Sequence, residues 1–188
     1  MNSARTCHVV FAALAVWIVP NGPALAQCEH GQSARIRPDD PQFQDRFGES
    51  VVLSGESALI GAPWDNESAF HAGAAYAFRF LDDGSREWAQ VAKLRASDGA
   101  ENDLFGFAVA RHGIVAAIGA PQADPRGSNS GAAYVSWKIG PEWVAQAKLT
   151  PEDGQAGDAF GWSLAVGDRF IVVGARRDDH DEVDSGSV

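Results

Sequence analysis

The chain repeats a set of short motifs at a nearly constant spacing, and this period constrains the fold more than any other feature. Phe-Gly occurs at residues 47–48, 105–106 and 160–161, so successive copies are 58 and then 55 residues apart. A Gly-Ala pair follows each copy at the same offsets. The repeated residues are Phe47, Gly48, Gly61, Ala62 and Pro63 in the first copy, Phe105, Gly106, Gly119, Ala120 and Pro121 in the second, and Phe160, Gly161, Gly174 and Ala175 in the third. A register held across this many positions indicates three copies of one structural unit.

Short apolar runs separated by Gly-containing pairs lie between these motifs and predict β-strands joined by tight hairpins. The predicted strands are 51–53, 58–60, 74–81 and 87–94 in the first copy, 107–110, 114–118, 132–137 and 142–149 in the second, and 162–166 and 170–173 in the third. No segment shows a sustained helical period. Each complete unit is therefore expected to be a sheet of four antiparallel strands.

A single sheet of this size cannot bury both of its faces, so the units are expected to stack face to face as propeller blades. The predicted fold class is all-β: a partial β-propeller of about three four-stranded antiparallel blades, which form an incomplete ring. The repeated phenylalanines are expected to wedge between neighbouring blades, and the glycine after each lets two backbones approach closely. Asp45, Asp103 and Asp158 are placed to accept hydrogen bonds from turn amides.

The predicted boundaries follow the repeats. They are a signal peptide over 1–26, an N-terminal segment over 27–46, blade 1 over 47–98, blade 2 over 103–153 and an incomplete blade 3 over 158–188. Residues 34–40 align with the outer strands of the later copies, so the N-terminal segment is expected to contain an outer strand. Known propellers have about four to eight blades. We therefore expect either a truncated version of a longer protein or a ring closed by several copies, with self-association through open blade edges.

The N-terminus has the three parts of an export signal in the expected order. Arg5 gives a positive start, 9–19 is an unbroken apolar run, and Ala24-Leu25-Ala26 is a small-residue cleavage site. The run is about half of the roughly 20 residues that a membrane span needs. The chain is therefore expected to be secreted, either extracellular or periplasmic, with Cys28 as its one remaining thiol and no internal disulfide.

The formal net charge of the chain is −10 at pH 7. Nucleic acids and anionic membranes bind surfaces that cluster Lys and Arg. The acidic balance therefore argues against both of these partners and is consistent with a preference for cations.

The Phe-Gly and Gly-Ala-Pro motifs together make the chain resemble FG-GAP repeat proteins, the type found in the integrin α-subunit propeller and in secreted bacterial proteins. The Asp-Gly…Asp-x-Phe-Gly spacers that begin at Asp98 and Asp153 resemble the bacterial variety most. The resemblance implies a seven-bladed propeller that is used for binding or adhesion, with no catalysis in the repeats. The family's calcium loop between the first two strands does not carry over, because only two residues stand there and calcium takes about six to eight oxygen ligands.

Acidic residues gather instead after the second strand of the third copy, and one hypothesis is that they bind a divalent cation such as calcium. The candidate ligands are Asp178, Asp179, Asp181 and Asp184. The alternative, which we favour, is a solvated loop, because the earlier copies have no matching set of acids. No other cofactor is expected.

No catalytic constellation is evident, so the segment is not expected to be an enzyme. His71, His112 and His180 are not repeated and fall in no nucleophile–base motif, and no P-loop or zinc-protease motif occurs. Trp64 lies in a connecting loop and could face a sugar, whereas Trp88 and Trp143 share one repeated strand position, which is typical of packing.

The leading hypothesis for the function is a secreted, non-catalytic binding or adhesion scaffold whose ligand is a protein or a glycan. It depends on the loops, which differ between copies while the strands agree. The main alternative is the propeller portion of a larger secreted enzyme, of the hydrolase or phospholipase type, whose catalytic domain is absent from this chain. A structural element of an envelope or matrix is a third hypothesis, since fold does not determine function.

Overall fold

The computed structural model describes residues 34–85, 87–179 and 184–188, and in this part of the chain it contains ten strands and no helix. All ten strands belong to the compact unit of residues 38–188. Of the other unit, residues 1–37, only 34–37 are described, and they form no strand. The predicted signal peptide lies outside the described residues. Within them, no helix is long and apolar enough to cross a membrane.

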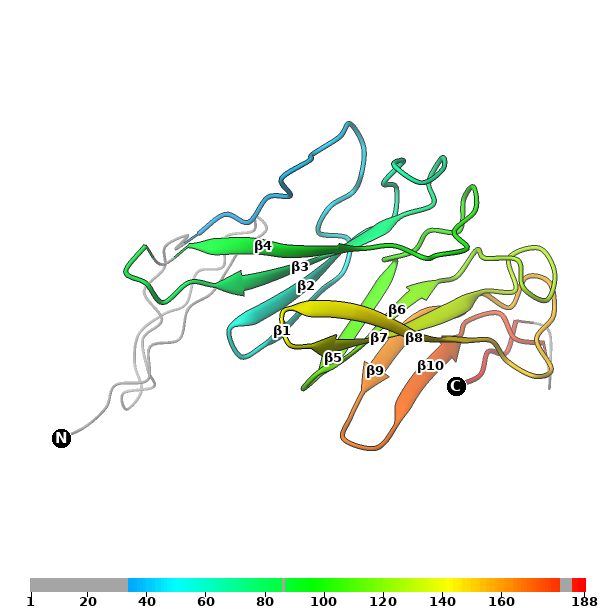
Figure 1. The fold of residues 1–188 in the computed structure, drawn as a ribbon. Coiled ribbons are helices and arrows are strands. Elements are labelled where there is room, and N and C mark those ends of the chain that lie inside the picture. Colours follow the sequence, from blue (N-terminus) through cyan, green and yellow to red (C-terminus); the bar gives the residue numbers. More distant parts are fainter. Residues whose placement is uncertain (1–33, 86, 180–183) are drawn as a thin grey trace, which may run out of the picture. The chain divides into compact units, whose positions relative to one another are not determined.

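The strands form two four-stranded antiparallel sheets and one two-stranded sheet (Figure 1). Sheet 1 consists of β1 (Val51–Ser54), β2 (Ser57–Ala62), β3 (Ala74–Phe80) and β4 (Trp88–Leu94), in that order. Sheet 2 consists of β5 (Ala108–His112), β6 (Val115–Ala120), β7 (Ala132–Ile139) and β8 (Glu142–Leu149). Sheet 3 consists of β9 (Phe160–Val166) and β10 (Ile171–Ala175). The fold is therefore all-β, an open partial β-propeller, as the repeats predict.

Equivalent positions in sheets 1 and 2 have the same local geometry. The first hairpin of each turns at a glycine with positive φ, Gly55 or Gly113, which suits a two-residue β-turn. The third and fourth strands of each sheet change register at matched sites, after Ala77 and after Val135. The 58-residue offset in the sequence is thus also an offset between structurally equivalent residues.

Residues 34–40 form no strand, so the outer strand predicted there is wrong. An outer strand exists only through hydrogen bonds to a third strand. Both complete third strands are already paired on both sides, because β3 lies between β2 and β4 and β7 lies between β6 and β8. In sheets 1 and 2, residues 34–40 therefore have no third strand with a free edge to pair with.

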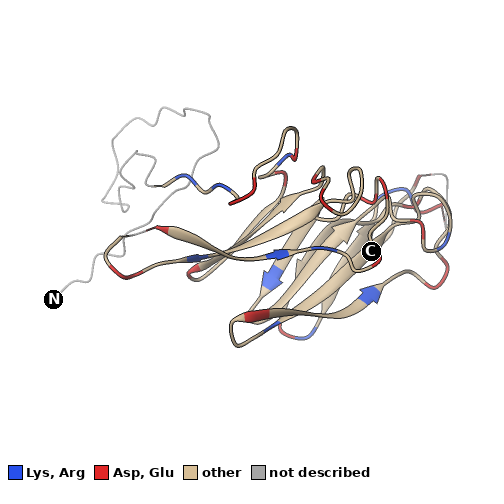
Figure 2. Cartoon of the chain, turned by 45° about the horizontal axis from the view of Figure 1, so that its top comes forward, with Lys and Arg blue, Asp and Glu red and all other residues tan. Residues whose placement is uncertain are grey.

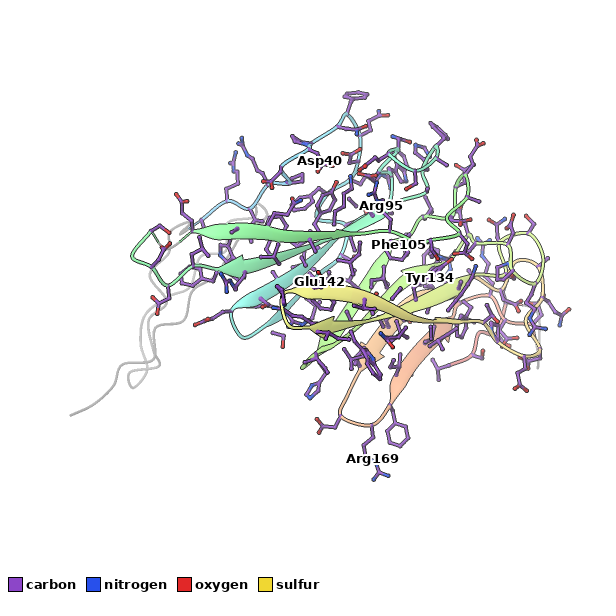
Figure 3. The ribbon with its side chains drawn as sticks, viewed as in Figure 1. Asp40, Arg95, Phe105, Tyr134, Glu142 and Arg169 are labelled. Carbon is purple, nitrogen blue, oxygen red and sulfur yellow. The ribbon has the colours of Figure 1, made fainter. Side chains whose placement is uncertain are left out.

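The hydrophobic core lies between the facing sheets, where β5 packs against β1 and β2, and β9 packs against β5 and β6. Leu59 from sheet 1 and Ile118 from sheet 2 are both fully buried there. Phe105 lies between the two sheets, and its ring packs edge-on against Tyr134 at 5.3 Å (Figure 3). The predicted wedge is therefore present at the junction of sheets 1 and 2.

Phe47 occupies the equivalent position at the start of sheet 1. Its ring packs edge-on against Tyr76, the counterpart of Tyr134, at 5.5 Å. Phe47 and Phe160 are only half-buried, whereas Phe105 is buried. The difference follows from the neighbours, because two complete sheets cover Phe105.

The glycines of the motifs allow the backbones of adjacent sheets to touch. A Cβ atom at Gly61 would lie 1.9 Å from the carbonyl oxygen of Gly106, and one at Gly119 would lie 2.0 Å from that of Gly161. Real Cβ atoms do not approach an oxygen so closely, so no larger residue fits at either position. The Ser50 hydroxyl donates a hydrogen bond of 2.9 Å to the same Gly106 oxygen and fastens the contact.

The aspartate two residues before each phenylalanine stabilises the turn that leads into the blade. Each carboxylate is buried and accepts a hydrogen bond from the backbone amide three residues earlier. These bonds join Asp45 to Gln42, Asp103 to Ala100 and Asp158 to Gln155, at 2.7, 2.8 and 2.6 Å. The predicted role of the aspartates is confirmed.

We predict that Gly119→Ala destabilises the protein, because its Cβ would collide with a backbone oxygen that cannot rotate away. The free energy of unfolding should fall by about 2 kcal/mol or more, and the melting temperature by about 4 °C or more. The matched control is Gly167→Ala at a hairpin tip, where the nearest atom to the new Cβ is 3.9 Å away. Thermal unfolding followed by circular dichroism measures both, and equal melting temperatures for the two variants would contradict the backbone contact.

Candidate functional site

The second-to-third-strand loops and the links between sheets all emerge at one end of the blades, which we call the loop end. It comprises residues 63–73, 95–107, 121–131, 150–159, 176–179 and 184–186. The antiparallel strand order places these segments together, opposite the hairpin tips. Many of the acidic residues lie on these loops (Figure 2).

The second-to-third-strand loops share one hydrogen-bonded frame. In each, an Asn or Asp side chain accepts a hydrogen bond from the backbone amide five residues later. The pairs are Asn66 with His71, Asp124 with Asn129, and Asp179 with Asp184. The later residue of each pair has positive φ, between 50° and 56°. A backbone bond closes each loop, for example from the Gly73 amide to the Asp65 carbonyl at 3.0 Å.

This frame gives two of the candidate cation ligands a structural role. Asp179 is the counterpart of Asn66, a neutral residue, and accepts the Asp184 amide. Asp178 accepts a hydrogen bond from the Ser187 hydroxyl. Asp181 lies outside the described residues, and within the described part of the chain no group of three acids, histidines or cysteines could hold a metal ion. Calcium binding by this loop therefore stays a prediction.

The strongest polar cluster of the loop end surrounds Lys93 in sheet 1 and includes residues that the sequence motifs did not single out. The Lys93 ammonium lies 2.6 Å from Asp40, 2.8 Å from Asp65 and 2.6 Å from Glu67. Tyr76 donates a hydrogen bond of 2.9 Å to Asp65. Arg95 pairs with Glu67 at the rim, and Asp40 and Arg95 both lie towards the loop end (Figure 3).

Sheet 2 repeats the cluster in a smaller form. The Lys148 ammonium lies 2.6 Å from Asp98, and Tyr134 donates a hydrogen bond of 2.9 Å to the same carboxylate. Asp98 is the counterpart of Asp40, but Ala123 and Pro125 stand where sheet 1 has its two other acids. Each cluster therefore has a repeated Asp–Tyr–Lys set, and only that of sheet 1 has a fully buried carboxylate in addition.

Burial and ion pairing shift the ionisation of these groups. Burial raises the pKa of Tyr134 to about 12, the hydrogen bond to Asp98 adds to the rise, and Lys148 opposes it. Burial likewise raises the pKa of Tyr76. Burial by itself would lower the pKa of Lys93, but its bonds to the three carboxylates outweigh burial and raise that pKa. At neutral pH the lysines are therefore charged and the tyrosines neutral, which suits ion-paired supports for the loops.

Trp64 lies in a stack of side chains at the loop end of sheet 1. The Arg46 guanidinium lies 3.4 Å from the centre of its ring system, and the His71 ring stacks on it at 4.7 Å. Two groups this close to the ring would overlap on one face, so they occupy opposite faces. The predicted sugar platform on Trp64 is therefore closed on both sides. Phe70 extends the stack, 3.8 Å from His71, and is exposed.

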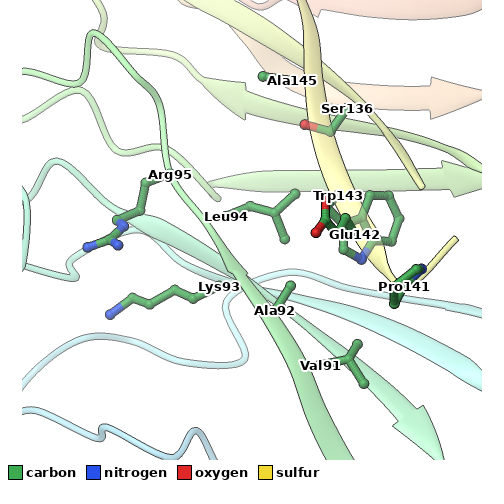
Figure 4. Close-up of a pocket in the computed structure, with 10 residues that line it drawn as sticks. All are labelled: Val91, Ala92, Lys93, Leu94, Arg95, Ser136, Pro141, Glu142, Trp143 and Ala145. Carbon is green, nitrogen blue, oxygen red and sulfur yellow. The ribbon is translucent and has the colours of Figure 1, made fainter. Parts of the chain in front are cut away.

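A groove of about 400 Å³ lies between the outer strands β4 and β8 (Figure 4). Leu94 and Trp143 face each other in it. Its two cationic residues, Lys93 and Arg95, are already engaged in the ion pairs described above. Trp143 also packs against the core between sheets 1 and 2, as its repeated strand position predicts.

The histidines that the structure describes lie apart from one another. His71 belongs to the stack with Trp64, and His112 lies 2.7 Å from Asp168 across two hairpin tips, away from the loop end. His180 lies outside the described residues. A second aromatic group lies at the junction of sheets 2 and 3, where the Trp162 ring is 4.5 Å from that of Phe107 and the Arg176 guanidinium lies 3.7 Å from the centre of the Trp162 ring.

Comparison with known protein families identifies three matches. A family model described as an FG-GAP repeat matches residues 30–78, 88–136 and 143–188. The second match begins at β4, the last strand of sheet 1, and ends in β7, the third strand of sheet 2. A family repeat therefore begins one strand earlier in the chain than a sheet does. No curated protein matches the chain. The resemblance drawn from Phe-Gly and Gly-Ala-Pro is confirmed.

We predict that Lys93→Met costs about 3 kcal/mol of unfolding free energy, because it leaves the buried Asp65 carboxylate without its cation. Asp65 is 1% exposed, whereas Asp98, the partner of Lys148, is 50% exposed and can regain water. The matched variant Lys148→Met should therefore cost less than about 1 kcal/mol. Urea unfolding measures both, and Asp65→Asn should restore part of the loss in Lys93→Met. Equal losses for the two lysine variants would contradict the distinction.

We also predict a late tyrosine titration. The unfolded chain releases its tyrosine protons near pH 10, whereas folded Tyr134 holds its proton to about pH 12. The folded state therefore binds more protons in this interval, and the free energy of unfolding should fall as the pH rises from about 10 to 12. Ultraviolet difference spectroscopy of the two tyrosines should detect little tyrosinate at pH 10. Asp98→Asn should lower the pKa of Tyr134 and leave that of Tyr76 unchanged.

Proposed function

The chain belongs to the FG-GAP repeat family, and from that premise we propose that it is an exported, non-catalytic binding module whose ligand surface is the loop end. The ligand class that this surface suits is a protein or a glycan on a cell or matrix surface. Adhesion is the activity that such binding would serve.

The proposal depends on one observation: the loops keep one backbone frame while their exposed side chains change. Each of the three copies has one Asx-to-amide bond and one closing backbone bond at matched positions. On this frame the first loop presents Phe70, and the equivalent position in the second is Ser128. A rigid frame with varied side chains is how recognition surfaces are commonly built.

Phe70 is the first candidate for a contact residue. Phe70 is 56% exposed. Its ring packs on His71, which in turn stacks on Trp64 and, through it, on Arg46. An aromatic side chain that is already ordered loses little conformational entropy when it binds, and such residues are enriched among those that contribute most to binding. The stack therefore supports a contact through Phe70 and not through the faces of Trp64.

Export is part of the proposal because of the N-terminal sequence. A basic residue, an apolar run and a small-residue site precede residue 27. The acidic net charge favours solubility and disfavours polyanionic ligands. Amino-terminal sequencing of the protein recovered from outside the producing cell would test this part, and a start near Gln27 is expected.

We predict that the protein is retained on at least one member of an array of extracellular-matrix proteins and surface glycans, and that Phe70→Ser weakens this retention about tenfold. The matched control is Ile114→Ser, because Ile114 is 57% exposed and lies at a hairpin tip at the opposite end. Retention that both variants keep would contradict the assignment of the loop end. Absence of retention on the whole array would contradict the proposed ligand class.

A further inference from the structure

The contact between adjacent sheets has a socket and an inserted carbonyl, and the chain contains two filled examples. In the first, Gly61 forms the socket, Ser50 borders it, and the Gly106 carbonyl enters it. In the second, Gly119 receives the Gly161 carbonyl. In both, the inserted carbonyl belongs to the glycine of a Phe-Gly pair, and the socket belongs to the second strand of the preceding sheet.

Sheet 3 has a third socket of the same construction. Gly174 lies on β10 opposite Ser163 on β9. A Cβ at Gly174 would lie 2.3 Å from the Ser163 hydroxyl, and the matching distance from Gly61 to the Ser50 hydroxyl is 2.4 Å. Apart from Ser163, the nearest atom to that Cβ is from Val188 at 3.8 Å, and it is not a carbonyl oxygen. Within the described residues, this socket receives no Phe-Gly pair.

A third Phe-Gly pair, Phe47–Gly48, enters no socket formed by the described residues. A Cβ at Gly106 would lie 2.1 Å from the Ala74 carbonyl of the preceding sheet, and one at Gly161 would lie 2.3 Å from that of Ala132. A Cβ at Gly48 would meet no described atom within 4 Å. Gly48 keeps the positive φ, 98°, of the two engaged glycines. The Phe47–Gly48 pair is therefore already in the engaged conformation.

Exposed apolar residues surround both free elements. On the first strand, Val51 and Leu53 are 61% and 62% exposed. Their counterparts in sheet 2, Val109 and Arg111, are half-buried and lie on β5, the strand that packs against β1 and β2. On sheet 3, Val172 is 47% exposed, whereas its counterpart Ala117 is fully buried. The two open faces therefore correspond to the two halves of an interface that the chain already forms between its own sheets.

We propose that a second copy of this chain docks head to tail, so that its Phe47–Gly48 pair enters the Gly174–Ser163 socket and its Val51 and Leu53 cover Val172. The occupant is identified by the internal interfaces, since the same chain already contains both complementary elements. The contact joins two different faces, so it is heterologous and extends to further copies until a ring closes. It does not use Phe70, the proposed ligand contact, so the two proposals can fail separately.

Sedimentation velocity of the full chain over a range of concentrations tests the proposal. The weight-average mass of the wild type should rise with concentration above that of one chain. Leu53→Lys and Val172→Lys should each weaken association more than about tenfold, because each buries an unpaired charge in the contact. Ile139→Lys is the matched control, because Ile139 has an exposure between those of Leu53 and Val172 but belongs to sheet 2 and to neither open face. It should associate as the wild type does.

A mixture of the two variants gives the sharpest outcome. Each keeps the face that the other has lost, so an equimolar mixture should form pairs and nothing larger. The proposal is overturned if the wild type keeps the mass of one chain at all concentrations. It is also overturned if either variant associates as strongly as the wild type, because the contact would then use strand edges or another surface. A mixture that forms no pairs also overturns it. Ala165→Lys on the same face replaces Val172→Lys if the latter does not keep the melting temperature of the wild type.

Discussion

The contact of a Phe-Gly carbonyl with a second-strand glycine is the constraint on which the rest of the structure depends. It brings two backbones together where no side chain fits, as the 1.9 Å approach at Gly61 and the 2.0 Å approach at Gly119 show. This contact sets the distance between the second strand of one sheet and the Phe-Gly segment of the next. The phenylalanine before the glycine then fills the wider space beside it, and alanines such as Ala75 and Ala132 leave room for that ring. The glycines, phenylalanines and alanines of the motifs therefore act together to form one contact between adjacent sheets.

The repeats in the sequence predicted this architecture well because each motif residue acts at a junction that recurs. Strand positions, hairpin tips and the aspartate-stabilised turns follow from local rules of turn chemistry and alternation. The prediction for residues 34–40 was wrong because similarity to an outer strand says nothing about whether a third strand has a free edge. The Lys93 cluster was missed because its acids are 26 to 53 residues away and form no motif. A signal did exist, since Lys93, Tyr76 and Asp40 all recur at the matched offsets.

In the third loop, an aspartate can be interpreted either as a cation ligand or as a structural hydrogen-bond acceptor. Five acids within seven positions suggest a cation site when they are considered alone. Comparison with the other loops changes that interpretation for Asp179, because Asn66 and Asp124 make the same bond to a backbone amide. An uncharged asparagine performs the same structural role, so the charge of Asp179 is not needed for it. Comparing the repeats therefore distinguishes side chains that the shared loop conformation needs from side chains that are particular to one loop.

The three sheets also differ in the number of neighbouring sheets that pack against them. Sheet 2 has neighbours on both faces, whereas sheets 1 and 3 each have one described neighbouring sheet. In a repeat array, stability is approximately the sum of the terms of each unit and of the interfaces between neighbours. Two described interfaces therefore stabilise three sheets, and the outer two depend on sheet 2 more than it depends on either of them. A contact between the free faces would add a third interface of the same kind, so association and folding stability would be coupled through one geometry.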